Sequence, residues 1–188
     1  MIRVRFGAPL RFSLDWSPPD PAHQPVDLDL CCLYRTVDDV RGAVQAVGRE
    51  GGPGPPTSLV VDGEPVIELG RDDSALGRPD GEHLVVHRPQ HLAFLVVGVS
   101  IYGGATEFGS VGAVVTVHRG QRRLRTVELG SSAAGMNWCA VLVAGHHDRR
   151  LYLVAEERYF LSAYHADRHY GFGLSWGLGS KHRSPTRH

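Results

Sequence analysis

The sequence predicts an all-β protein, an antiparallel β-sandwich of two sheets with a short helical segment near the C-terminus. Three observations support this prediction. Short apolar segments follow one another along most of the chain, Gly and Pro separate them, and there is neither a heptad pattern nor an internal repeat. A chain of 188 residues is expected to form one domain, and we place it at residues 1–181 with a flexible tail at 182–188.

The first part of the chain contains several short strand patterns. Residues 2–6 and 10–16 are expected to form an opening hairpin, and residues 26–34 a buried strand. Residues 17–25 hold four prolines, so this stretch cannot join the interior of a sheet. Residues 38–47 allow either a helix or a strand, but their glycine and β-branched valines favour a returning strand.

The rest of the chain continues the same pattern. Residues 58–69 carry two short apolar runs around an Asp-Gly pair, and hairpin turns are expected at 118–121 and 145–148. A helix is expected at 163–170, ended by the glycine that follows it. The remaining expected strands are residues 84–86, 92–101, 111–119, 124–129, 138–144 and 151–159.

Composition excludes several classes of protein. The chain has 20 basic and 20 acidic residues, and this balance argues against bulk attraction to nucleic acid or to an anionic membrane. No apolar run approaches 18 residues, so we expect no transmembrane segment, and the first residues lack the long apolar stretch of a secretory signal. Two of the three cysteines are neighbours and neighbours rarely pair, so we expect reduced thiols in a cytoplasmic protein.

Two acidic segments are the best candidates for chemistry. In Asp27-Leu28-Asp29-Leu30 the period of a strand puts both carboxylates on one side and both leucines on the other. A second segment, 72–82, carries further acids in a loop with a glycine. Ca²⁺ takes 6–8 oxygen ligands in flexible geometry, and a cation would relieve the repulsion among these acids. From the residues alone, solvated surface acids are the alternative to a calcium site.

The order of these motifs resembles the tellurium-resistance TerD-domain family, and the later motifs resemble its TerA-type branch. The resemblance spans about residues 11–181. It implies a β-sandwich from cytoplasmic bacterial proteins linked to tellurite and other stress resistance, with Ca²⁺ in the acidic loops and no established enzymatic activity. The motifs are Asp27-Leu28-Asp29-Leu30, Gly70-Arg71-Asp72-Asp73-Ser74, Asp80-Gly81-Glu82, Val99 to Gly104, Cys139-Ala140-Val141, Glu157 to Phe160, Asp167 to Trp176 and Gly179-Ser180-Lys181.

The resemblance also implies a set of calcium ligands. Asp27 and Asp29 match the Asp-x-Asp of the family, and the acidic loop would supply further carboxylates with backbone or hydroxyl donors. Arg71 and Arg78 add positive charge within that loop, so one, two or no bound ions stay open. The predicted metal ligands are Asp27, Asp29, Gly70, Asp72, Asp73, Ser74, Asp80 and Glu82.

We therefore expect a non-enzymatic calcium-binding module that acts as a scaffold or sensor in a bacterial cytoplasmic stress-response complex. Its expected partners are other proteins of that complex, with the inner membrane surface as one place of assembly, and no nucleic acid. One alternative is a TerD-like interaction module that has lost metal binding. The other is a carbohydrate- or small-ligand-binding sandwich, which would need a concave pocket lined by His and aromatic residues.

Other chemical signals in the sequence are weak. His165 and His169 would share a helix face and could ligate a transition metal, but such pairs are more often surface or packing residues. Residues 131–135 are small but do not form a nucleophile elbow, and buried thiols are inert. Residues 119–125 hold four basic side chains in an expected hairpin, with nucleic-acid binding as the minor alternative. The aromatic block at 164–176 is expected to cover an open edge or end of the sandwich.

Overall fold

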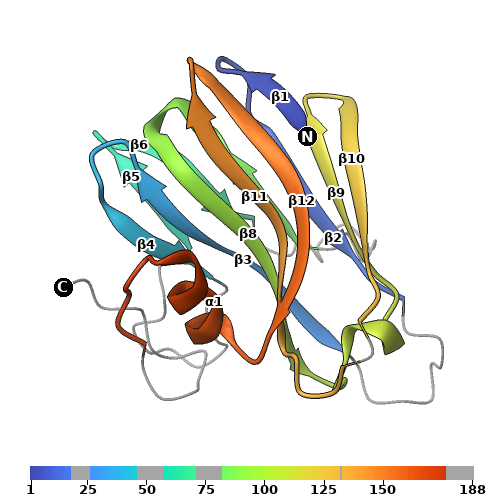
Figure 1. Cartoon of the computed structure of the whole chain (residues 1–188). Helices are drawn as coiled ribbons and strands as arrows, with labels where there is room; N and C mark the ends of the chain where they lie inside the picture. Colours follow the sequence, from blue (N-terminus) through green and yellow to red (C-terminus); the bar gives the residue numbers. More distant parts are fainter. Residues whose placement is uncertain (18–25, 46–56, 71–81, 132, 177–188) are drawn as a thin grey trace.

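The computed structural model describes residues 1–17, 26–45, 57–70, 82–131 and 133–176. Two six-stranded antiparallel sheets pack against each other, and one helix lies near the C-terminus (Figure 1). The predicted antiparallel sandwich is therefore confirmed. Within the described ranges, no helix has the length and apolar character needed to cross a membrane. The predicted tail at 182–188 lies outside the described residues.

The first sheet has the strand order β1-β12-β11-β8-β3-β4, and every neighbouring pair is antiparallel. Its central strands are apolar on both faces because one face meets the second sheet and the other lies beneath the helix. The strands are β1 (Ile2–Arg5), β12 (Arg150–Phe160), β11 (Trp138–His147), β8 (Leu92–Gly103), β3 (Asp27–Thr36) and β4 (Arg41–Val44).

The second sheet has the order β10-β9-β2-β7-β6-β5 and presents its outer face to solvent. Strand β2 shows the reason: its leucines and phenylalanine are buried, while the residues between them face outward. The strands are β10 (Arg122–Leu129), β9 (Ala113–Arg119), β2 (Leu10–Asp15), β7 (His83–Val86), β6 (Glu64–Leu69) and β5 (Ser58–Val61). Two short 3-10 helices, η2 (Pro89–His91) and η3 (Phe108–Ser110), precede β8 and β9.

The main core lies between the two sheets and includes Phe12, Leu30 and Phe108, which are fully buried. A second, smaller cluster covers the outer face of the first sheet, where Trp138 and Phe172 are buried. Burial of these large side chains supplies most of the driving force for folding.

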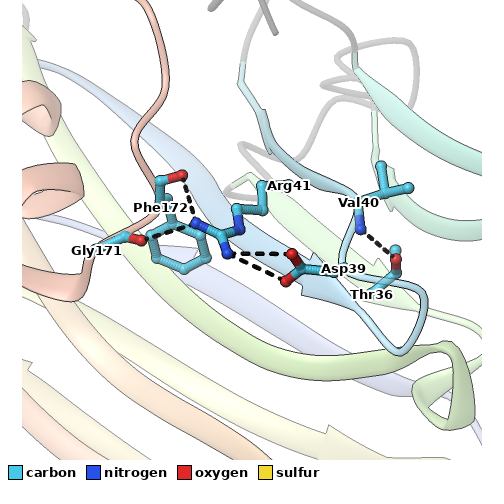
Figure 2. Close-up of polar contacts among 6 residues, drawn as sticks. All are labelled: Thr36, Asp39, Val40, Arg41, Gly171 and Phe172. Atoms are coloured by element: carbon cyan, nitrogen blue, oxygen red, sulfur yellow. Dashed lines mark hydrogen bonds and ion pairs between the residues drawn. The ribbon is translucent and has the colours of Figure 1, made fainter. Parts of the chain in front are cut away.

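Helix α1 (Ala163–Tyr170) ends at Gly171, whose φ of 72° is left-handed, as the sequence predicts. The aromatic block around it does not cover an edge or end of the sandwich as expected: Phe172 packs into the cluster on the outer face of the first sheet. An apolar patch there is too large to leave in water. Figure 2 shows how the segment is held: the Arg41 guanidinium donates to the carbonyls of Gly171 and Phe172 and pairs with Asp39.

The expected opening hairpin is wrong. Strand β1 pairs with β12, while β2 pairs with β7 and β9 in the other sheet. The segment between β1 and β2 contains Gly7, at φ 108°, and crosses from one sheet to the other, so that both strands turn apolar side chains into the shared core. The hairpins β9–β10 and β11–β12 are confirmed. The second hairpin turns at Asp148 and Arg149, at the end of the predicted turn, residues 145–148.

Candidate metal centre

The predicted Asp-x-Asp motif lies at the beginning of β3. Asp29 is 6% exposed and pairs in register with Ser100 on β8, whereas Asp27 is exposed. A register shift separates Asp27 from Leu28 in this pairing. Leu28 belongs to the core between the sheets, as the motif predicts for its leucines.

One edge of β3 is open over its first half within the described ranges. Strand β4 pairs only with residues 32–35 of β3, so β8 alone flanks the residues before them. Glu82, which immediately precedes β7 of the second sheet, lies at this edge, where its carboxylate accepts a hydrogen bond from the Leu30 backbone N–H. The Glu82 carbonyl accepts from the Leu14 N–H at 2.8 Å, which fixes its backbone to β2. Glu82 therefore joins the two sheets.

Glu82 and Asp29 form a carboxyl–carboxyl pair with a hydrogen bond between their side chains. Burial, followed by the charge of Asp29, raises the pKa of Glu82 to about 8, and Asp27 adds to the rise while the Leu30 N–H opposes it. A hydrogen bond between two carboxyl groups needs a proton on one of them. The pair therefore holds a proton at neutral pH.

Four of the eight predicted ligands lie within the described residues: Asp27, Asp29, Gly70 and Glu82. The structure brings Asp29 and Glu82 together, with Asp27 close enough to act on the Glu82 pKa. Gly70 donates its N–H to the carbonyl of His83 at 2.8 Å and so lies at the same end of the second sheet. The other four predicted ligands, and the two arginines of their loop, lie outside the described residues: Asp72, Asp73, Ser74, Asp80, Arg71 and Arg78.

The donor chemistry of this place suits a hard cation. The described part of the chain contains no group of three or more His, Cys, Asp or Glu side chains placed to hold a metal. Its carboxyl pair nevertheless offers only oxygen donors, which Ca²⁺ prefers, and Glu82 comes two residues after Asp80, the last of the remaining predicted ligands. The residues present therefore fit part of a calcium site.

Two features of the candidate metal centre could not be predicted from the sequence. The Leu30 backbone N–H can donate to a side chain because β4 pairs only with residues 32–35 of β3. The His83 ring lies over Gly70, where an added Cβ would come within 1.9 Å of the imidazole Nε2. A larger residue at position 70 would therefore displace the His83 ring, which favours glycine there independently of any ligand role.

The other predicted constellations have ordinary structural partners. His165 accepts or donates a hydrogen bond with the Ser162 hydroxyl at 2.9 Å, and His169 packs its ring 5.4 Å from that of Phe160. All three cysteines are free and buried, so the predicted absence of a disulfide holds. Burial raises the pKa of Cys32 to about 12, which keeps this thiol protonated and inert.

Two surface hollows bear on the small-ligand alternative. One, of about 190 Å³, lies beside the Arg41 contacts of Figure 2 and is lined by aromatic rings and two arginines but no histidine. The other, of about 490 Å³, lies on the outer face of the second sheet and contains His118 but no aromatic ring. Neither hollow combines histidine with aromatic residues, the combination that the carbohydrate alternative requires.

Comparison with known proteins supports the fold. No family model matches the sequence, and no curated protein matches it. Solved structures do match, among them SAV2460, a protein of unknown function, with TM-score 0.58 and 20% identity, and SCO6318 from Streptomyces coelicolor A3(2), with TM-score 0.57 and 22% identity. Each alignment covers 82% of this chain and 91% of the other. SCO6318 is described as a homologue of the telluride resistance protein TerD.

The chain has the fold of a TerD homologue. This confirms the TerD-like part of the resemblance at the level of fold. At 20 and 22% identity the likeness establishes the fold alone, and the TerA-type branch stays a prediction.

Proposed function

We propose that this protein is a non-enzymatic calcium-binding module of the tellurite-resistance type, acting as a scaffold or sensor in a bacterial cytoplasmic complex. The observation that carries the proposal is the Asp29–Glu82 carboxyl pair at the open edge of β3. The TerD-like fold supports the stress-response part of the proposal, since SCO6318 is described as a homologue of a telluride resistance protein.

Asp29 and Glu82 would hold the ion together with Asp27 and acids of the 72–82 loop. Ca²⁺ would take the place of the shared proton between the two carboxyl groups, and their oxygens would coordinate it. Asp29 belongs to the first sheet and Glu82 immediately precedes β7 of the second, so an ion held by both would tie the two sheets to each other and to the loop. A loop ordered in this way would present a calcium-dependent surface to a partner protein of the stress-response complex, including one at the inner membrane surface.

Calorimetric titration with CaCl₂ tests the calcium site directly. We expect binding in the micromolar to millimolar range, weakened at least tenfold in Asp29→Asn and Glu82→Gln, because each removes an anionic donor. Glu128→Gln is the matched control, since Glu128 is an exposed acid on β10. Below pH 8 the titration heat should also depend on the ionisation enthalpy of the buffer, because the ion displaces the shared proton.

The absence of binding heat at millimolar CaCl₂, or equal affinity in the wild type and both site variants, would contradict the proposal. Amide exchange gives a separate test of the sensor role. We expect residues 70–82 to exchange more slowly with Ca²⁺ than with chelator, and equal rates would refute the switch while leaving the binding result intact.

The second candidate is a TerD-like interaction module that has lost metal binding. One observation favours it: Asp29 and Glu82 already satisfy each other through a shared proton. Thermal unfolding with CaCl₂ or with EDTA distinguishes the two, because a ligand of the native state raises the unfolding midpoint. A midpoint that is the same in both conditions supports the second candidate.

A further inference from the structure

The outer face of the second sheet carries a row of three basic side chains. Arg11 on β2 lies opposite His118 on β9, and His118 lies opposite Arg123 on β10. Neighbouring strands are about 4.8 Å apart, so the two arginine backbones flank His118 at about 10 Å from each other. Arg11 lies more than a hundred residues before His118 and Arg123 in the sequence, and the pairing of β2 with the β9–β10 hairpin brings the three together.

This row places two guanidinium charges on either side of an imidazole. Like charges close together on one face of a sheet repel. Among the hydrogen bonds and ion pairs of the described residues, none involves the side chain of Arg11, His118 or Arg123. Arg41 of the first sheet differs in this respect, because it pairs with Asp39 and two carbonyls. An anion bound to the row would remove the repulsion.

A row of hydroxyl groups lies beside the basic row. Ser13 on β2 is opposite Thr116 on β9, which is opposite Thr126 on β10. One further step along β2, Asp15 adds a carboxylate. The basic row, together with Ser13 and Thr116 of the hydroxyl row, borders the hollow of about 490 Å³, a volume typical of small-molecule sites. The hollow is lined by Arg11, Ser13, Asp15, Thr116, His118, Gly120, Gln121 and Arg123.

We propose that this hollow binds a phosphorylated polyol of the sugar-phosphate class. The phosphate would sit on Arg11, His118 and Arg123, where guanidinium groups make charge-assisted hydrogen bonds to its oxygens. The polyol hydroxyls would pair with Ser13 and Thr116 and donate to the Asp15 carboxylate, which repels a phosphate but accepts from a hydroxyl.

The composition of the hollow disfavours larger anionic partners. The described residues that line it include no aromatic ring, so they offer no stacking platform to a nucleotide base or a single-stranded nucleic acid. Asp15, in the lining, and Glu128, the outward residue two beyond Thr126 on β10, place negative charge on the same face. A nucleic-acid surface needs a continuous run of cations, which these acids interrupt. The proposal does not depend on calcium, because the carboxyl pair lies at the other sheet's edge.

Nuclear magnetic resonance titration of the full chain with glucose 6-phosphate tests the proposal, with glucose, inorganic phosphate and a polyglutamate peptide as separate probes. We expect shift changes confined to β2, β9 and β10, and weaker binding of phosphate or glucose alone. Arg11→Gln and Arg123→Gln should each weaken glucose 6-phosphate binding by roughly 10- to 100-fold, the loss typical of a charge-assisted hydrogen bond. Arg122→Gln is the control, because Arg122 has the same charge in the same hairpin but does not line the hollow.

Several results would overturn the proposal. They are no glucose 6-phosphate binding by the wild type at millimolar concentrations, shift changes on other strands, or equal weakening in Arg122→Gln and Arg123→Gln. Equal affinity for inorganic phosphate would overturn the polyol part, and binding of the peptide alone would assign the face to an acidic protein instead. Arg11 and Arg123 are exposed, so the variants should fold, and thermal unfolding checks that they do. Shift mapping on the wild type needs no variant and decides the location by itself.

Discussion

The stability of the protein without calcium should fall as pH rises from 5 to 9, because of Glu82. Its pKa is raised from 4.5 to about 8 in the native state, chiefly by burial. Between those values the native protein binds a proton that the unfolded chain has released, so folding stability decreases with pH across this window. Below pH 4.5 the carboxyl is protonated in both states and contributes no penalty.

The magnitude follows from the size of the pKa shift. At about 1.4 kcal/mol per pKa unit, the full shift sets an upper bound of roughly 5 kcal/mol. Glu82 is only part-buried, and solvent screening reduces this figure, so we expect a loss of about 2 kcal/mol between pH 5 and 9. For a chain of this length, that corresponds to a fall in the melting midpoint of roughly 4–8 °C.

Urea unfolding in EDTA, followed by the fluorescence of the buried Trp138, measures this loss. The decisive comparison is with Glu82→Gln, because an amide cannot ionise but still offers an oxygen to the Leu30 N–H. The variant should lack the wild-type decline, whereas Glu128→Gln should keep it. A wild-type profile parallel to that of Glu82→Gln would refute the assignment of the proton to this pair. Saturating Ca²⁺ should restore wild-type stability at pH 9 if the ion replaces the proton.

Three further predictions concern packing. Gly98→Ala should lower the free energy of unfolding by about 1–3 kcal/mol, because its Cβ would lie 2.1 Å from a ring carbon of buried Trp138. Asp167→Ala should cost about 2 kcal/mol, because the buried carboxylate accepts hydrogen bonds from the Leu174 N–H at 3.1 Å and the Trp176 indole at 2.9 Å. The three buried cysteine thiols should resist Ellman's reagent in the native protein and react fully on unfolding in urea.

Each of these predictions has a control or an outcome that would contradict it. Urea unfolding of Gly130→Ala, at a glycine with open space around its Cβ position, should show a far smaller change than Gly98→Ala. For Asp167→Ala, unchanged fluorescence of Trp176 together with unchanged stability would show that the carboxylate does not hold the segment after α1. Stoichiometric labelling of any thiol in the folded protein would contradict the burial of the cysteines.

Local patterns account for the parts of the fold that the sequence predicts correctly. Alternation identifies β2 because one face meets the core and the other meets water. The helix at 163–170 is recognised because Gly171 supplies the left-handed residue that ends it. The opening hairpin fails for a physical reason: alternation shows that β1 and β2 are strands but carries no information on their partners, and both pair with distant segments.

For the same reason, the sequence predicts only part of the candidate metal centre. Asp29 is identified by its place in a strand motif, and Glu82 by its place in an acidic loop. Their contact depends on β4 covering only half of β3, which leaves the Leu30 N–H for a side chain of the other sheet. A strand that stops early is a property of the tertiary arrangement, and neither propensity nor periodicity specifies it.

The zero net charge of the chain results from segregated charges, and β2 shows how one strand separates them. Its Leu14 N–H holds the backbone of Glu82, which turns its carboxyl toward β3 at the edge between the sheets. Its Arg11 and Asp15 side chains point the other way, into the hollow with the basic row. One strand therefore contacts both positions, through its backbone at Glu82 and through its outward side chains at the hollow. The net charge is a sum over the whole chain, so it does not show that acidic and basic side chains gather at two different positions in the fold.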